Sequence, residues 1–133
     1  MRVVVDASVV VAALVDSGPV GTWAESFLTA DVLTAPHLLP VEVSNCLRRA
    51  TRAGNLSPDL ASIAHTDLAS LRVDLYPFAP FSARVWDLRS NLTAYDAWYV
   101  ALAEHLDCDL ATIDTRLVRS PGPRCGFLVP EAS

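Results

Sequence analysis

Short runs of β-branched and other apolar residues alternate with longer amphipathic segments along the whole chain. These runs predict buried strands at 2–8, 31–36, 73–78, 108–114 and 125–130. The segments between them predict helices at 9–15, 20–30, 37–54, 56–71, 80–92 and 93–106, with a helical turn at 115–120. Because strands that alternate with helices are joined by right-handed crossovers, the sequence predicts an α/β fold with a central parallel sheet of about five strands, covered on both faces.

Turn and cap residues mark several boundaries in this pattern. Gly18 and Pro19 separate the first two helices, and Gly54 ends the helix expected at 37–54. Ser57 is an N-cap candidate for the following helix, because Pro58 suits the first helical position.

Composition limits the class of protein. The chain has 133 residues and is 52% apolar, enough to bury the core of one domain spanning 1–133. Its three cysteines lack Cys-x-x-Cys spacing, which argues against a disulfide framework or a structural zinc site. Asp6, Ser8 and Asp16 interrupt the apolar N-terminal stretch, and no segment has the ~20 apolar residues of a membrane span. We therefore expect a soluble cytoplasmic chain with no membrane partner.

The basic residues are ten arginines, and the chain has no lysine. A P-loop is excluded because it needs a lysine. Receiver domains and haloacid-dehalogenase-like phosphatases also begin with an apolar strand and an aspartate, but they too use a lysine. The net charge of −5 argues only weakly against a nucleic-acid partner.

Four acidic residues stand where a carboxylate is costly to bury or needs a local partner. Asp6 and Asp114 each end a predicted strand, and a parallel sheet would bring them to one edge. Glu42 lies beside the apolar stripe of the helix at 37–54, and Asp96 has apolar neighbours in the helix at 93–106.

Each acid also has a simpler explanation. Asp6 and Asp114 could cap the helices that follow them, and Glu42 could lie on a solvated helix edge. Asp96 is an N-cap if its helix begins at Ala97, but an interior acid if the helix begins at Thr93 or Ala94.

Helix capping is a sufficient explanation for any one of these acids, but it is a weaker explanation for all four together. Four carboxylates at one sheet edge would repel each other, and a divalent cation relieves that repulsion. Oxygen ligands without Cys or His select Mg²⁺ or Mn²⁺. Such a site suits phosphodiester hydrolysis, because the metal activates water, orients the phosphate and stabilises the developing charge.

Three segments carry a family resemblance: VVVDAS at 3–8, LLPVEVSNCLRRA at 38–50 and TAYDAWYVALAEHLDCDLATIDTRL at 93–117. Together they resemble the PIN-domain ribonucleases, and within these the VapC-type toxins of bacterial toxin–antitoxin pairs. The third segment is the most specific, because it combines Asp-Ala, a helix ending in Ala-Leu-Ala-Glu and a strand ending in Thr-x-Asp. The resemblance covers nearly the whole chain and implies a three-layer α/β/α sandwich.

The resemblance also implies roles for residues. Asp6, Glu42, Asp96 and Asp114 match the acidic metal-site positions of the family, where they would hold Mg²⁺ (or Mn²⁺). Ser8 and Thr112 match its hydroxyl positions, which we interpret as supporting groups or as positioning a water. Some members carry another acid shortly after the last aspartate. Arg116 and Leu117 follow Asp114 here, so a second metal would be held loosely or arrive with the substrate.

The activity implied is metal-dependent endonucleolytic cleavage of RNA, leaving 5′-phosphate and 3′-hydroxyl ends. The partners implied are a cognate antitoxin that covers the site and a second copy in a homodimer. Arg116 and Arg119 follow the last acid and are expected to contact RNA. For the cluster Arg48, Arg49 and Arg52, solvated helix surface is the favoured explanation. Tyr99 is expected in the core.

Other functions stay open. The same fold could bind nucleic acid without cutting it, or cut single-stranded DNA. A phosphatase acting on small phosphate esters is disfavoured, because no second nucleophile and acid pair stands out. A metal-free ribonuclease built on two histidines and a lysine is excluded by the absence of lysine.

Overall fold

The central strand of the fold is β1, Arg2–Val5, whose three valines are fully buried. A computed structural model describes residues 1–131. In it, β1 pairs with β2, Val32–Pro36, on one side and with β4, Leu110–Ala111, on the other. The outer strands are β3, Val73–Tyr76, and β5, Phe127–Leu128. The sheet order is β3-β2-β1-β4-β5, and every pairing is parallel.

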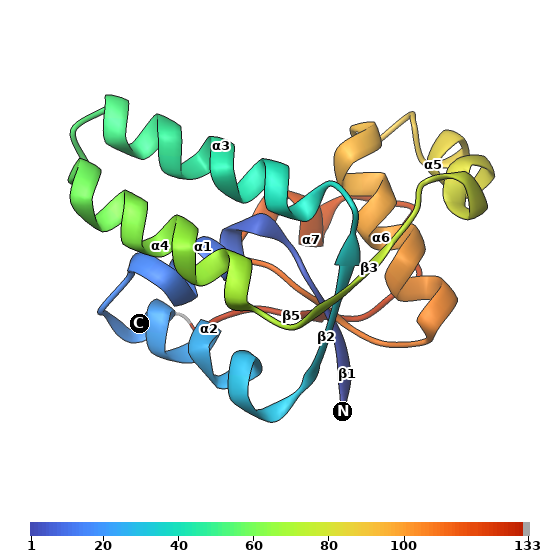
Figure 1. Ribbon diagram of the computed structural model, residues 1–133. Helices are drawn as coiled ribbons and strands as arrows, with labels where there is room; N and C mark the ends of the chain where they lie inside the picture. The colour runs from blue at the N-terminus through green and yellow to red at the C-terminus, as the bar shows by residue number, and fades with distance from the viewer. Residues whose placement is uncertain (132–133) are drawn as a thin grey trace.

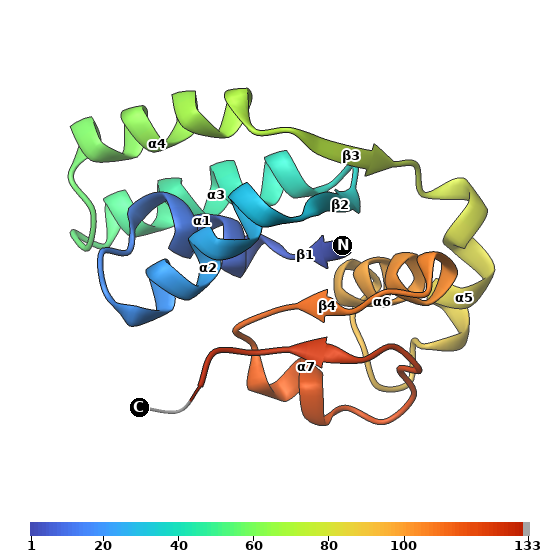
Figure 2. The same ribbon diagram turned by 90° about the horizontal axis from the view of Figure 1, so that it is seen from below.

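Helices lie on both sides of this sheet (Figures 1 and 2). One side carries α1 (Ala7–Val15), α2 (Pro19–Ala30), α3 (Leu39–Arg52) and α4 (Pro58–Ser70), which contact one another. On the other side α6 (Ala94–Leu106) packs on β1, β2 and β4, with α5 (Ser82–Asp87) against it. The last helix, α7 (Thr115–Arg119), follows β4. The predicted layered α/β fold with a five-stranded parallel sheet is confirmed.

The marked boundaries also agree with the structure. Ser57 caps α4, because its hydroxyl accepts a hydrogen bond from the Leu60 amide at 3.2 Å. Gly54, which follows α3, has a φ of 80°, in the left-handed region that favours glycine. Pro19 is the first residue of α2.

Several predicted elements are shorter than expected. The strand expected at 2–8 ends at Val5, because Asp6 already caps α1, and the strand expected at 125–130 is reduced to Phe127–Leu128. The strand expected at 108–114 is reduced to Leu110–Ala111. The Thr112 amide still bonds to the Leu128 carbonyl of β5, but the amides of Ile113 and Asp114 bond to the side chains of Ser8 and Thr112 instead of a neighbouring strand.

The helix expected at 80–92 divides into a 3₁₀ turn at Ala79–Phe81 and α5, which ends at Asp87. The Leu88 amide bonds to two carbonyls of the preceding turn and so tightens the helix end.

Within residues 1–131, no single helix is both long enough and apolar enough to cross a bilayer. Among these residues, the pair of α1 and α2 is long and apolar enough when taken together, but a bend of 107° separates the two helices.

Candidate active site

The fold brings the four acids to one edge of the sheet. Asp6 directly follows β1, and Asp114 lies three residues beyond β4, the neighbour of β1. Glu42 is in the first turn of α3, the helix that follows β2. Asp96 is in the first turn of α6, which runs back across the sheet towards the start of β4. All four therefore lie where the parallel strands end, the edge at which such sheets bind ligands.

Asp6 is held by a network that joins the ends of β1 and β4. Its Oδ1 atom caps α1 by accepting a hydrogen bond from the Val9 amide at 3.2 Å. The hydroxyl of Ser8 also donates to Oδ1, and the hydroxyl of Thr112 donates to Oδ2. The expectation of a cap is thus correct for Asp6, but the cap accounts for only one of its three hydrogen bonds.

The two hydroxyl residues are themselves fixed from the other strand. Ser8 Oγ accepts from the Ile113 amide at 3.2 Å, and Thr112 Oγ1 accepts from the Asp114 amide at 3.0 Å. The residues after β4 are therefore tied to those after β1 by a chain of side-chain bonds. Ser8 and Thr112 contact Asp6, and their contribution to catalysis stays a prediction.

For Asp96, the structure decides between the two positions that the sequence left open. Thr93 is the N-cap of α6, and its Oγ1 accepts from the Asp96 amide at 3.2 Å. The helix begins at Ala94, so Asp96 is an interior residue of the first turn rather than a cap. The positive end of the helix dipole favours a carboxylate there.

Glu42 has a partner that sequence reasoning did not identify. The hydroxyl of Tyr99, a buried residue of α6, donates to Glu42 Oε1 at 2.6 Å. The expectation that Tyr99 lies in the core is correct, and its hydroxyl also links α6 to α3. The available signal was its position three residues after Asp96, which puts both side chains on one helix face.

The electrostatics link the acids to each other. Asp6 keeps some exposed surface but is surrounded by protein, and burial raises the pKa of its carboxyl, with a further rise from the charge of Asp96. Burial also raises the pKa of Glu42, and the charges of Asp96 and Asp6 add to it. For Asp96, burial is again the main cause of a raised pKa, followed by the charge of Asp114. Each of these three carboxyls is therefore less acidic than usual because of burial and like charge.

Asp114 lies at the open side of the group. Its Oδ1 caps α7 by accepting from the amides of Arg116 at 2.9 Å and Leu117 at 3.4 Å. The Arg116 guanidinium is almost fully exposed and lies 3.7 Å from the same oxygen. Arg119 is exposed on the same short helix. Arg116 thus lies beside the acidic edge, and contact of Arg116 and Arg119 with RNA stays a prediction.

The carboxylate oxygens of the four acids are ligands of the type that a hard divalent cation prefers, but they do not surround a cation on all sides. Within the described residues, no three carboxylate, imidazole or thiol groups are close enough to form a ready metal site. Mg²⁺ commonly binds through one or two carboxylates and keeps several waters or substrate oxygens, so an open oxygen-only edge is compatible with it. Burial is the main cause of the raised pKa of Asp6, Glu42 and Asp96, and the charge of neighbouring carboxylates adds to it, so a bound cation would favour their charged forms.

Comparison with known proteins defines the family. The PIN domain family model matches residues 3–122. Ribonuclease VapC1 of Mycobacterium tuberculosis is 42% identical over 123 residues, 92% of each chain. Ribonuclease VapC9 of the same organism is 39% identical over 127 residues, 96% of this chain and 97% of VapC9. This chain therefore belongs to the PIN domain family, and within it to the VapC group.

Solved structures share the fold at low sequence identity. VapBC2 from Rickettsia felis, solved bound to a DNA fragment from its promoter, aligns with a TM-score of 0.69 and 12% identity, covering 98% of this chain and 100% of that chain. VapC20 of Mycobacterium tuberculosis, described as a sarcin-ricin loop cleaving toxin, aligns with a TM-score of 0.66 and 15% identity, covering 87% and 92%. A toxin–antitoxin complex from Klebsiella pneumoniae aligns with a TM-score of 0.62 and 13% identity, covering 97% of this chain and 98% of that chain.

Proposed function

We propose that this chain is a Mg²⁺- or Mn²⁺-dependent endoribonuclease and the toxin of a toxin–antitoxin pair. The observation that carries the proposal is the group of four carboxylates at the sheet edge, three of which have a pKa raised by burial and mutual charge. The ribonuclease names of relatives that are about 40% identical over nearly the full length support RNA as the substrate.

In this proposal Asp6, Glu42, Asp96 and Asp114 hold the cation. When bound, the metal supplies an activated water and stabilises charge on the phosphate and the leaving 3′ oxygen. The protein supplies position. Ser8 and Thr112 orient the two oxygens of Asp6, and Tyr99 orients Glu42. The chemistry needs no attack by the 2′-hydroxyl, so the products carry 5′-phosphate and 3′-hydroxyl ends.

Arg116 and Arg119 contact the RNA backbone in this proposal. Both are exposed on α7, directly after the Asp114 cap. A guanidinium binds phosphate oxygens in a bidentate manner, which places the strand against the acids without reading its bases.

The proposal is tested by replacing single aspartates with asparagine, which removes the negative charge but keeps the size and shape of the side chain. We expect Asp6→Asn and Asp96→Asn each to abolish Mg²⁺-dependent cleavage of RNA, and growth inhibition on expression, while circular dichroism shows an unchanged fold. If both variants cleave RNA as well as wild type, the acidic edge is not the active site. Running wild type on RNA and on single-stranded DNA in parallel separates a ribonuclease from a deoxyribonuclease, and no cleavage of either would indicate a binding module.

The partners belong to the same proposal. Structures of the same fold include VapBC2 and a toxin–antitoxin complex, which supports a cognate antitoxin for this chain in the cytoplasm. A homodimer is also expected. Co-expression with the product of a small adjacent reading frame should suppress growth inhibition and yield a stable complex on size-exclusion chromatography.

A further inference from the structure

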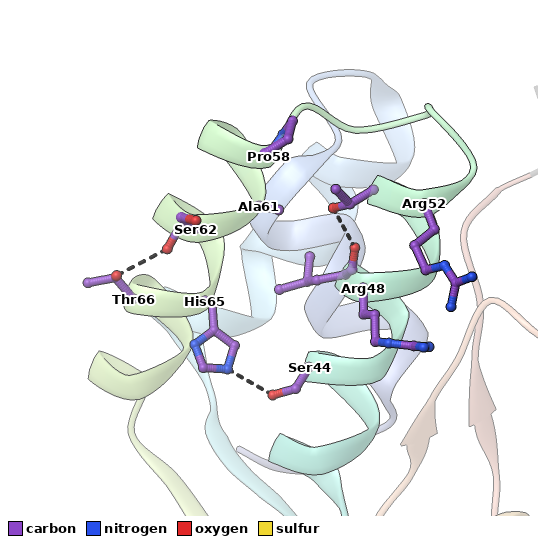
Figure 3. Close-up of a pocket in the computed structure, with 10 residues that line it drawn as sticks. Ser44, Arg48, Arg52, Pro58, Ala61, Ser62, His65 and Thr66 are labelled. Atoms are coloured by element: carbon purple, nitrogen blue, oxygen red, sulfur yellow. Dashed lines mark hydrogen bonds between the residues drawn. The ribbon is translucent and has the colours of Figure 1, made fainter.

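A groove runs between α3 and α4 (Figure 3), and none of the four acids of the sheet edge lines it. It has a volume of about 600 Å³. Arg48 and Arg52 line it from α3, and Ser62 and His65 line it from α4. In Figure 3 the two arginine side chains extend from α3 in the same direction, on the side away from α4, so they form the outer rim of the groove. The groove is thus walled by groups that donate hydrogen bonds, two of them permanently cationic.

This groove continues towards the carboxylates. A second hollow of about 690 Å³ is lined by Glu42, Asn45, Arg49 and Tyr95, and it shares Ser44 and Arg48 with the first. Along α3, Arg48 lies about 9 Å and Arg52 about 15 Å from Glu42 at 1.5 Å per residue. One helix therefore carries a carboxylate of the proposed active site at its start and cations at increasing distance from it.

The arginines of this groove are not neutralised by the protein. Within residues 1–131, none of Arg48, Arg49 and Arg52 has a carboxylate within ion-pair distance. Glu42 is the one acid among the residues that line either hollow. In a chain of net charge −5, three unpaired arginines on one helix form a local positive surface that an anion would neutralise.

His65 and Ser44 form a pair here, but the pair is not a nucleophile and its base. The Ser44 hydroxyl donates its single hydrogen to the Pro40 carbonyl at 2.8 Å. The His65 Nε2 atom, 2.9 Å from Ser44 Oγ, must then be the donor in that contact. A serine in this state is not activated for attack, so the groove suits binding rather than hydrolysis.

We propose that the α3–α4 groove binds the RNA strand flanking the scissile bond, with Arg48 and Arg52 each contacting a backbone phosphate. The inference rests on the proposed ribonuclease function and extends its substrate path beyond α7. The two arginines are one helical turn apart, about 6 Å along the axis, a spacing that suits successive phosphates of an extended strand. Such contacts position RNA without reading its sequence.

The experiment measures binding without cleavage. Fluorescence anisotropy in EDTA, with a randomised 20-nucleotide single-stranded RNA, is compared for wild type, the Arg48→Gln/Arg52→Gln double variant and Arg72→Gln. Arg72 carries the same charge but precedes β3, at the opposite edge of the sheet. We expect the double variant to bind about tenfold more weakly and its slope of log affinity against log salt to be smaller by about 1.4, because two phosphate contacts are lost. We expect Arg72→Gln to resemble wild type.

Several results would overturn the proposal. An affinity and salt slope of the double variant equal to those of wild type would remove the groove from the RNA path. An equal loss in Arg72→Gln would indicate net charge alone. If the double variant keeps RNA binding but loses binding to a polyglutamate peptide, the groove serves an acidic protein partner instead. Because the assay needs no catalysis, wild-type cleavage in Mg²⁺ tests the ribonuclease function separately.

Discussion

Asp6 shows how one residue combines a structural and a proposed catalytic role. A carboxylate offers about four lone-pair sites, and three are used by Val9, Ser8 and Thr112. About one remains for a cation, so the bonds that build the fold also fix the direction from which a metal can approach. Capping and metal binding therefore do not compete at this position.

Tyr99→Phe tests a positioning residue. Its hydroxyl donates to Glu42 at 2.6 Å, and the bond lowers the pKa of Glu42 against the larger effect of burial. Without it, Glu42 is less well oriented and protonates more easily. We expect a loss on the order of tenfold in cleavage at limiting Mg²⁺, recovered in part at higher Mg²⁺, with the fold retained.

Tyr76→Phe is the matched control, because the Tyr76 hydroxyl bonds to exposed Arg2 rather than to an acid. A purely structural role for Tyr99 would lower thermal stability and leave the Mg²⁺ dependence unchanged. That pattern would contradict the prediction.

At the scale of elements, the sequence predicted which segments are helices and strands but not how they meet. The apolar runs locate the strands but not their ends, since the runs at 108–114 and 125–130 form strands of only two residues each. The signals from Gly54 and the Ser57 cap are correct. The start of α6 was undecided because Thr93 and Asp96 are both good cap residues, and only the structure shows that Thr93 takes that role. Contacts such as Tyr99 with Glu42 depend on how α3 and α6 pack on the sheet, so no local pattern reveals them.

The same limit applies to the candidate site and the groove. Asp6 and Asp114 were predicted to lie at one edge because they follow strands of a parallel sheet, and Glu42 and Asp96 were added from helix position and the family motifs. The α3–α4 groove was not predicted, since a cluster of arginines on one helix is usually solvated surface. The groove exists only because α4 packs beside α3 and supplies Ser62 and His65 as its second wall.

Glu104 joins three elements on the far side of the sheet. Its carboxylate accepts two bonds from Arg84 of α5, at 2.7 and 3.1 Å, and one from the Arg124 amide at 2.8 Å. Arg84 also donates to the Gly122 carbonyl at 2.9 Å. The two side chains of the pair are only 24% and 15% exposed, so this ion pair is better shielded than a surface pair.

Glu104→Gln should therefore destabilise the protein by about 1–2 kcal/mol at neutral pH, measured by urea unfolding. Burial alone would raise the pKa of Glu104, but the bonds from Arg84 and Arg124 lower it overall. A lowered pKa supplies stability above the ordinary value of 4.5, and the stability is lost as the pH falls through the folded-state value. The difference between the variant and wild type should shrink in that acidic range.

Glu25→Gln provides the comparison, because Glu25 is exposed on α2 and has no ion pair within the described residues. If both variants lose the same stability, the clamp between α5, α6 and residues 122–124 contributes nothing specific.

Across the whole molecule, charge is distributed unevenly. The chain carries fifteen acids against ten arginines, yet four acids meet at one sheet edge while arginines line α7 and the α3–α4 groove on either side. The fold thus sets an anionic centre between cationic flanks. This arrangement suits a polyanion bound through its flanks and a cation bound at the centre.

The anionic centre should also control how the stability of the whole fold depends on pH. Asp6, Glu42 and Asp96 have a pKa raised above the ordinary values, 3.8 for Asp and 4.5 for Glu. Such groups bind protons more tightly when folded, so metal-free protein should gain stability as the pH falls from neutral through their raised folded-state pKa values. Below that, the loss from Glu104 opposes the gain. The metal-free protein should therefore be most stable at mildly acidic pH.

Mg²⁺ should reverse this trend, because it favours the charged carboxylates and binds only the folded chain. Thermal unfolding across this pH range, with EDTA or with Mg²⁺, measures both effects. We expect Mg²⁺ to raise the Tm at neutral pH by about 2–4 °C for each kcal/mol of binding energy, and less in acid. In Asp96→Asn one like charge is removed, so the metal-free variant should be more stable than wild type at neutral pH and gain less from Mg²⁺. Identical pH profiles for the two proteins in EDTA would show that the acids at the sheet edge do not interact as a group.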